Sequence, residues 1–245
     1  MVKESRARYV RRAATDKPVL DRNRKPGGER WAELLETSAK IFAAKGYAAT
    51  SLQDIAEELQ ILKGSLYYYI DSKEDLLYEV IRDVLVKAHD HLSELALLEG
   101  TGAERLERVI HAHVEYLLDH LTATTVYLHE ITRLDHARRK SLPSHNFVSM
   151  IAELLQAGQE DGSIRKDIDV EIWTLSILGT ANWVYRWYTP GRSPSKEKVA
   201  SEIAAFNRAA LERVTATRSA SSAAVRSRTK PVAATKARPS RPKAS

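Results

Sequence analysis

Residues 50–75 restrict the fold of this chain most, because two short amphipathic segments follow one another across a turn of only four residues. In the first segment Ile55, Ala56 and Leu59 recur at the spacing of one buried helical stripe. In the second, Leu66 and Ile70 are one helical turn apart and can anchor the same face. The spacing therefore predicts two short helices joined by a tight turn.

Small polar residues mark where these helices begin. Thr50 and Ser51 can accept hydrogen bonds from the free N–H groups at the start of the first helix. Ser72 and Asp75 form a Ser-x-x-Asp capping pattern, and Leu76 follows it as the first residue of an apolar stripe. A third helix is therefore expected to start at residue 72.

The second helix exposes small, hydroxyl and phenol side chains instead of a charged, solvated face. In a helix-turn-helix, the leading end of the second helix lies at the base edges of the major groove. Lys63, Gly64 and Ser65 occupy that end. Tyr67 and Tyr68 are expected to bind phosphates, because a phenol carries its hydroxyl on a rigid arm.

Two neighbouring side chains receive different interpretations. Tyr69 is expected to face the core, towards Ile41 and Phe42. Lys73 lies in the first turn of the third helix, where a cation opposes the helix dipole. A nearby phosphate explains that lysine better than helix stability does.

Four segments together resemble the N-terminal domain of the tetracycline-repressor (TetR) family over residues 31–80. They are residues 41–47 (IFAAKGY), 49–56 (ATSLQDIA), 63–70 (KGSLYYYI) and 72–77 (SKEDLL). The resemblance implies a homodimeric, all-helical regulator whose first three helices bind DNA and whose larger C-terminal domain binds a small molecule that releases the DNA. The family's DNA contacts would fall on Ser51, Gln53, Lys63, Gly64, Ser65, Tyr67, Tyr68 and Lys73.

Two positions in the turn depart from the family pattern. Gln60 stands where glycine is usual, and Leu62 stands where a small capping residue is usual. A residue other than glycine is therefore expected to adopt a left-handed backbone in this turn.

The charge of the chain is unevenly distributed. The net charge is +6 overall, but residues 1–30 carry +6 and residues 215–245 carry +8, which leaves −8 for residues 31–214. Both termini are rich in cations and poor in apolar residues, so residues 1–28 and 215–245 are expected to be disordered. They are either solvated tails or arms that add sequence-independent affinity for DNA.

Several classes of protein are excluded by what the sequence lacks. The chain has no cysteine, which removes disulfides, thiol nucleophiles and cysteine metal sites. No apolar run is long enough to span a bilayer, so a cytoplasmic, nucleoid-associated protein without membrane contact is expected. The His111-x-His113 pair points to different helix faces, and neither a metal site nor a catalytic constellation is predicted.

The sequence beyond residue 80 predicts further helices and no strands. They are expected over residues 72–98, 103–120, 124–140, 142–158, 170–188 and 195–214. The fold class is therefore all-α. Together with the resemblance, this implies a helix-turn-helix domain (29–75) and a larger ligand-binding and dimerisation domain (76–214). The helices over 143–158 and 170–188 are expected to pair with their copies in a second subunit, because their apolar faces exceed what one subunit can cover.

One helix combines an amide, a guanidinium and indole rings. Asn182 and Arg186 are four residues apart and are expected to share one face, with Trp183 beside them. Such a group suits an anionic or thioester-bearing ligand. Arg186 stacked on Trp187 and paired with a carboxylate is the structural alternative, and spacing alone leaves both open.

The C-terminal half carries a second resemblance. Residues 183–191 (WVYRWYTPG), with 156–162 (QAGQEDG) and Asp167 to Asp169, resemble the TetR-family branch that controls fatty-acid and sterol-ring catabolism. The resemblance implies an effector that is an acyl-coenzyme A thioester, with Trp183 and Arg186 beside it and no other cofactor.

A cationic cluster in the expected helix over 124–140 has two interpretations. It contains Arg133, Arg138, Arg139 and Lys140. These side chains are either ordinary solvated surface or the mouth of a pocket that receives the phosphates of coenzyme A.

The sequence thus predicts a TetR-type repressor that binds a palindromic operator and is released by an effector. Two rival classes remain: a sequence-nonspecific nucleoid protein driven by its tails, and a helical-bundle enzyme that lacks a recognisable catalytic site.

Overall fold

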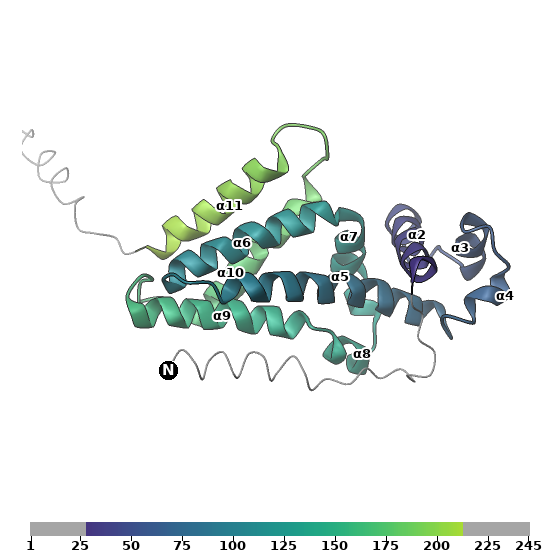
Figure 1. Ribbon diagram of the computed structural model, residues 1–245, viewed down its shortest axis with the longest axis horizontal. Helices are drawn as coiled ribbons and strands as arrows, with labels where there is room; N and C mark the ends of the chain where they lie inside the picture. Colours follow the sequence, from purple (N-terminus) through teal and green to yellow (C-terminus); the bar gives the residue numbers. More distant parts are fainter. Residues whose placement is uncertain (1–27, 213–245) are drawn as a thin grey trace, which may run out of the picture. The chain divides into compact units, whose positions relative to one another are not determined.

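The computed structural model describes residues 28–212, and all of its regular structure in that range is helical (Figure 1). The helices are α2 (Glu29–Lys45), α3 (Leu52–Glu58), α4 (Lys63–Leu66), α5 (Lys73–Ala96), α6 (Gly102–Asp119), α7 (Leu121–Glu130), η1 (Ile131–Arg133), α8 (His136–Ser141), α9 (Ser144–Asp161), α10 (Val170–Asn182), η2 (Trp183–Arg186) and α11 (Lys196–Leu211). The all-α prediction is confirmed. The predicted basic arm and tail, and the predicted last helical residues 213–214, lie outside the described residues except for Gly28.

Side-chain caps explain where most of these helices begin. Ser51 and Thr101 form complete capping boxes with Asp54 and Glu104, which start α3 and α6. Ser72 accepts from the Asp75 N–H at the start of α5, as the sequence predicts. Asp135, Asp169 and Ser195 cap α8, α10 and α11 in the same way.

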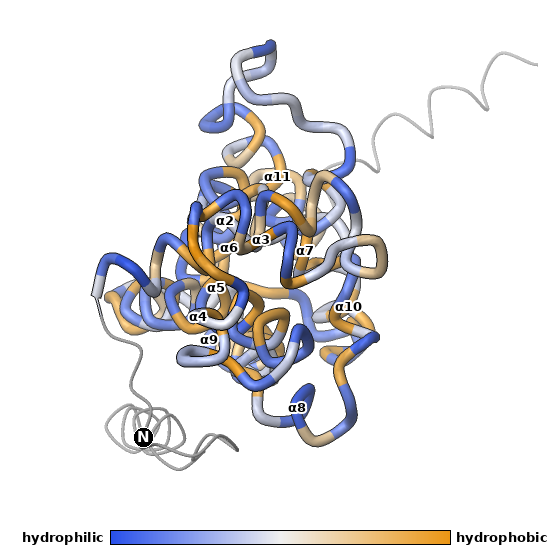
Figure 2. The backbone as a smooth tube through the Cα atoms, turned by 90° about the vertical axis from the view of Figure 1, so that its right-hand side faces the viewer, coloured by the Kyte–Doolittle hydropathy of each residue, from blue (hydrophilic) through white to orange (hydrophobic). Residues whose placement is uncertain are grey.

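Helix α5 belongs to both halves of the described chain. Its first turns share an apolar cluster with α2, α3 and α4, and its last turn packs with α6 and α9 in a second cluster. In Figure 1, α2, α3 and α4 gather near the start of α5, whereas α6, α9 and α10 lie along its other end. Figure 2 shows apolar and polar residues alternating along the helices, as expected for amphipathic packing.

The prediction of a single helix over residues 124–140 is wrong. The chain forms α7, a turn of 3-10 helix (η1) and the separate helix α8. Leu134 between them is extended, with φ −66° and ψ 142°, and is fully buried. The break allows Leu134 to enter the apolar cluster, and Asp135 then caps a new helix.

The helix expected over residues 170–188 is also not a continuous α-helix. It is α-helical from Val170 to Asn182 and tightens to 3-10 helix from Trp183 to Arg186. The predicted end near Tyr188 is close to the observed one, but residues after Asn182 point in different directions from those of a continuous α-helix.

No helix within residues 28–212 has both the length and the apolar character needed to cross a bilayer.

Candidate DNA-binding and effector sites

The outer face of α4 carries the side chains that the sequence assigns to DNA. Lys63, Gly64, Ser65, Tyr67 and Tyr68 are all exposed. Tyr68 is the most exposed of the tyrosines at 72%. The helix itself is short, and Tyr68 and Tyr69 continue it in a tighter turn through N–H bonds to Ser65 O and Leu66 O. These residues form one continuous polar and phenolic surface, which we call the reading face.

The opposite side of α4 anchors the reading face. Leu66 is fully buried and Ile70 nearly so, in the same cluster as Ile55. Tyr69 is half-buried against this cluster, which contains Phe42, and its ring stacks on Trp31 at 6.2 Å between centroids. The prediction that Tyr69 faces the core is confirmed. The reading face is therefore presented by a rigid support.

The turn before α4 contains the left-handed backbone conformation that was predicted for it. Gln60 has φ 54°, the left-handed conformation predicted for a residue other than glycine. Leu62 precedes α4 without a side-chain cap and is 80% exposed. Sequence reasoning did not list Leu62 as a DNA contact, although its departure from the family's capping residue was a signal. An exposed leucine beside the reading face can contact the methyl group of thymine.

Two residues that are predicted to contact DNA form hydrogen bonds within α3 and its N-terminal cap. Ser51 is exposed, but its hydroxyl donates to Asp54 Oδ2 (2.7 Å) and accepts from the Asp54 N–H. The bond from the Ser51 hydroxyl, a second from the Ser51 N–H and one from Lys45 hold the pKa of the Asp54 carboxyl well below its usual value. Gln53 Nε2 donates to Glu57 Oε1 (2.9 Å) along α3. Both side chains lie at the surface, and contact with DNA by either remains a prediction.

Contacts within the protein explain why residue 73 is a lysine. The ammonium donates to the carbonyl oxygens of Tyr47 (2.9 Å) and Thr50 (2.6 Å) and lies 4.4 Å from the centre of the Tyr47 ring. Lys73 therefore fixes the loop between α2 and α3. This role does not need a phosphate, so the dipole argument alone no longer assigns Lys73 to DNA.

The residues predicted to bind an effector are not brought together. Asn182 points inward, where its Oδ1 accepts a hydrogen bond from Nε2 of the partly buried His113 at 2.8 Å. Trp183 is 61% exposed and Arg186 is exposed, with its guanidinium 6.0 Å from the Tyr185 ring. The shared face of Asn182 and Arg186 does not form, because residues four apart in a 3-10 helix lie about a third of a turn from one another.

Arg133 lies elsewhere in the structure. It pairs with Glu130 and lies 5.9 Å from the Tyr47 ring, at the junction with the DNA-binding helices. The four cations that were predicted to form one cluster therefore have different surroundings. Arg138 is engaged by carboxylates, whereas Arg139 and Lys140 are exposed.

The sequence analysis considered His113 only as one half of the His111-x-His113 pair and gave it no role at the effector site. It lies on the inner side of α6, stacks on Phe147 of α9 at 4.5 Å, and has a buried Nδ1 with no hydrogen-bond partner among the described residues. Burial lowers its pKa despite the bond to Asn182, which favours the neutral ring. The only signal was that His113 follows Ile110 at helical spacing. His111 points away, towards Glu115 and Ser201, as the i, i+2 spacing predicts.

The apolar faces divide differently from the prediction for α9. Its large apolar side chains, Met150, Ile151, Leu154 and Leu155, are buried within the subunit. Ile172 and Leu175 of α10 and Phe206 of α11 are instead 60–63% exposed. The apolar surplus therefore lies mainly on α10 and α11, while α9 exposes only Val148 among its described large apolar side chains.

Within residues 28–212, no group of three or more histidine, aspartate or glutamate side chains is arranged to hold a metal ion.

Comparison with known proteins agrees with this geometry. Residues 34–80 match the model of the bacterial regulatory proteins of the tetR family, and residues 99–211 match the tetracyclin repressor-like C-terminal domain. The HTH-type transcriptional repressor KstR2 of Rhodococcus jostii (strain RHA1) is 34% identical over 191 residues, 77% of this chain and 93% of that protein. KstR2 of Mycobacterium tuberculosis (strain ATCC 25618 / H37Rv) is 31% identical over 76% of this chain and 95% of that protein.

Solved structures share the fold. That of the ketosteroid transcriptional regulator KstR2 of Mycobacterium tuberculosis superposes with a TM-score of 0.70 at 29% identity, covering 76% of this chain and 97% of that chain. AibR, solved in complex with isovaleryl coenzyme A and operator DNA, has a TM-score of 0.67 at 23% identity, covering 73% and 97%. The helix-turn-helix, the helical C-terminal domain and these relatives together show that the chain belongs to the TetR family of bacterial transcriptional regulators.

Proposed function

We propose that this protein is a repressor that binds a palindromic operator as a homodimer and releases it when it binds an acyl-coenzyme A thioester. The observation that carries the proposal is the reading face on α4, whose polar side chains are exposed while Leu66 and Ile70 hold the helix from beneath. A repressor of this kind acts on chromosomal DNA in the cytoplasm.

The reading face combines two kinds of contact. Lys63, Gly64 and Ser65 form the leading end of α4, where a helix in the major groove meets base edges. Tyr67 and Tyr68 follow, and we assign them to phosphates, because phosphate contacts fix orientation without reading sequence. The division assigns preference between operators to Lys63 and general affinity to Tyr68.

The first prediction separates these roles. Lys63→Ala should change the ranking of operator variants by about 1–3 kcal/mol, whereas Tyr68→Phe should weaken cognate and random duplexes alike. Fluorescence anisotropy on an operator selected from genomic fragments, with single-base variants and a random duplex, measures both. Lys87→Ala removes the same charge from α5, far along the chain from the reading face, and is the control.

Equal effects of Lys63→Ala and Tyr68→Phe on all duplexes would contradict the assignment. The same titrations test the rival function. A specific repressor keeps a large operator-over-random ratio at physiological salt, whereas a tail-driven nucleoid protein loses affinity for both duplexes together as salt rises.

Three observations support an effector site near the end of α10. Trp183 and Arg186 present an indole and a guanidinium to solvent, and no described carboxylate lies within ion-pair distance of Arg186. Asn182 connects this surface to His113, whose buried Nδ1 lacks a partner. AibR, which has the same fold, was solved with isovaleryl coenzyme A. Thioester and phosphate groups suit such a guanidinium.

The second prediction concerns the response to effector. Arg186→Leu should leave operator affinity near wild type and abolish release by acyl-coenzyme A thioesters. A thermal-shift screen of thioesters and their free acids first identifies the effector, since a ligand of the native state raises the melting temperature. Arg192→Leu, an exposed arginine in the loop before α11, is the matched control. Release of Arg186→Leu at the wild-type effector concentration would assign Arg186 a structural role.

Dimerisation is supported by the exposed apolar faces of α10 and α11. Ile172 and Leu175 recur along one side of α10, with Phe206 exposed on α11. Gly179 lies in the same stripe and has no atom within 4 Å of an added Cβ, so another helix can approach closely. An exposed patch of this kind marks an interface. We assign it to a second copy of the chain.

A further inference from the structure

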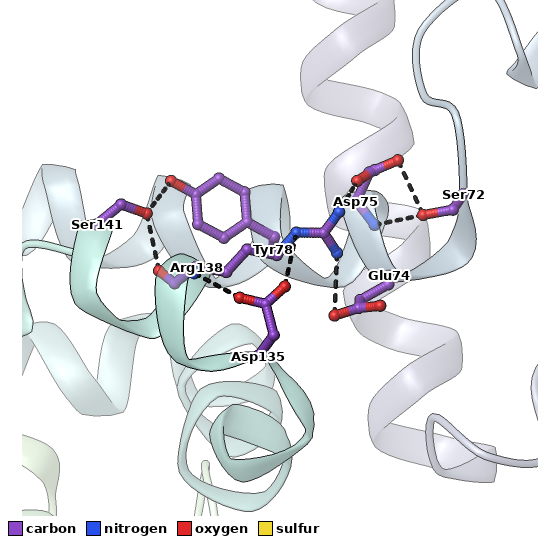
Figure 3. Close-up of polar contacts among 7 residues, drawn as sticks. All are labelled: Ser72, Glu74, Asp75, Tyr78, Asp135, Arg138 and Ser141. Carbon is purple, nitrogen blue, oxygen red and sulfur yellow. Dashed lines mark hydrogen bonds and ion pairs between the residues drawn. The ribbon is translucent and has the colours of Figure 1, made fainter. Parts of the chain in front are cut away.

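The short helix α8 is fixed to the first turn of α5 by a network of ion pairs centred on Arg138 (Figure 3). The guanidinium pairs with Asp75 through Nη2, with Glu74 through Nη1 at 3.1 Å, and with Asp135 through Nε at 3.8 Å. Glu74 and Asp75 belong to α5, and Asp135 caps α8 itself. One cation therefore faces three carboxylates from two helices.

Two further contacts hold α8 in place. Tyr78 of α5 and Ser141 at the end of α8 form a hydroxyl hydrogen bond of 2.9 Å, and Ser141 also bonds Arg138 O. Leu134 and Leu142, which flank α8, are both buried in the apolar cluster of the DNA-binding helices. The position of α8 is thus fixed relative to α5 from both of its ends.

Asp75 gives the network its strength. Its side chain is only 6% exposed, and that of Arg138 is 21% exposed. Asp75 also accepts a hydrogen bond from the Ser72 hydroxyl (2.8 Å), while its own N–H donates back to Ser72. The same carboxylate therefore belongs to the cap of α5 and to the pair with α8. Separating a buried carboxylate from its cation strongly destabilises the folded protein. The pair therefore favours the arrangement of α5 and α8 in which the two charges meet.

The first turn of α5 leads directly to the reading helices. Lys73, two residues before Asp75, holds the carbonyls of Tyr47 and Thr50 in the loop that precedes α3. Arg133, just before α8, lies over the ring of the same Tyr47 at 5.9 Å. The connection between α7 and α9 therefore contacts the loop before α3 through Arg133 and the first turn of α5 through Arg138.

On its other side, α8 leads to the proposed effector site. Only Leu142 and Pro143 separate α8 from α9. Phe147 in the first turn of α9 stacks on His113, and His113 bonds Asn182 at the end of α10. A contiguous chain of contacts thus runs from Asn182 through His113 and Phe147 to α8, and from Arg138 to Asp75. Contiguity makes coupling physically possible, and only a change in coupling demonstrates it.

We propose that Arg138 is the positioning residue that couples effector binding to the DNA-binding helices. By tying α8 to the first turn of α5, it makes any displacement of the start of α9 move the loop before α3 as well. The inference rests on the proposed function, since it needs an effector that binds near Asn182. In this role Arg138 acts through Glu74 and Asp75 and not by touching DNA or effector.

The test compares Arg138→Met, Arg138→Lys and the control Arg139→Met, which removes an exposed cation from the next position of the same helix. The measured quantity is the ratio of operator Kd with and without saturating acyl-coenzyme A thioester. Wild type and Arg139→Met should give a ratio of about 5 to 150, the usual range of coupling. Arg138→Met should give a ratio under about 3, and Arg138→Lys, which keeps the charge, an intermediate value.

A second measurement excludes a merely structural role. Calorimetric titration should show that the thioester binds DNA-free Arg138→Met as tightly as it binds wild type. The inference is overturned if Arg138→Met keeps the wild-type ratio, or if it loses the ratio only because it no longer binds the thioester.

A third measurement needs no effector and keeps the inference distinguishable from the proposed function. The sequence has no cysteine, so Glu58→Cys on α3 and Glu153→Cys on α9, both exposed, can carry a pair of spin labels. With labelled protein diluted into unlabelled protein, the distance distribution within one subunit should broaden in Arg138→Met and not in Arg139→Met. If no thioester releases the wild-type protein from its operator, the proposed effector class is wrong. The spin-label distances still test whether Arg138 positions the DNA-binding helices. An unchanged distribution in Arg138→Met overturns the inference.

Discussion

The Gly102→Ala variant should lose about 3 kcal/mol or more of unfolding free energy. A Cβ on Gly102, the first residue of α6, would lie 2.2 Å from Gly158 N and 2.4 Å from Gly158 Cα in α9. Both are backbone atoms in a helix, so no side chain can move aside. The Gly102 N–H also donates to Asp161 Oδ2 at 2.6 Å, which fixes the two helices at this distance.

Thermal and denaturant unfolding measure this loss. For a domain of this size the melting temperature should fall by about 6–12 °C. Gly64→Ala is the matched control, because a Cβ there meets no atom within 4 Å and the backbone is helical. Its stability should stay within about 1 kcal/mol of wild type. A Gly102→Ala protein as stable as Gly64→Ala would show that α6 and α9 can separate at little cost.

The Leu175→Glu variant should be a monomer with greatly reduced operator affinity. Leu175 is 60% exposed in the middle of the apolar stripe on α10, and a carboxylate there would be buried unpaired against its own copy across a two-fold axis. Without the second reading head, operator affinity should fall by about 100-fold or more, since linked binding of two half-sites is lost. Analytical ultracentrifugation at micromolar concentration and anisotropy on the operator measure the two effects.

Val148→Glu adds the same charge to α9, where Val148 is an exposed apolar residue. This control should remain a dimer with wild-type affinity, because the other large apolar side chains of α9 are used inside the subunit. If Val148→Glu dissociates and Leu175→Glu does not, the interface lies on α9, which is one of the two helices that the sequence pattern suggested. If neither variant dissociates, the apolar stripe on α10 has another partner.

The local features of this protein could be predicted because their causes lie within a few residues. The caps at Ser51 and Ser72 use a side chain and a backbone N–H three residues away. The left-handed Gln60 follows from a turn that ordinarily needs glycine. Exposure of Tyr68 beside buried Leu66 follows from helical periodicity in the same short segment. Thus the exposed side of α4 could be predicted from the sequence, whereas its contact with DNA stays a prediction.

The candidate effector site was readable only in part. Asn182, Trp183 and Arg186 were expected on one face, but the helix tightens after Asn182 and turns them in different directions. The change from α- to 3-10 helix has no strong signal in residues 182–188. Likewise the break at Leu134 interrupts a sequence that has helical character on both sides. In both places packing against other helices decided a conformation that local preference left open.

The sequence by itself determined the all-helical class, the start of most helices and the identity of the reading face, because each depends on contacts between near neighbours in the chain. The tertiary structure alone decided which distant side chains meet. Arg138 finds Asp75 across 63 residues, and His113 finds Asn182 across 69. It also decided that α9 is covered within the subunit while α10 keeps an exposed apolar stripe. Such choices depend on how all helices pack at once, since every apolar face has several possible partners and only the assembled core selects among them.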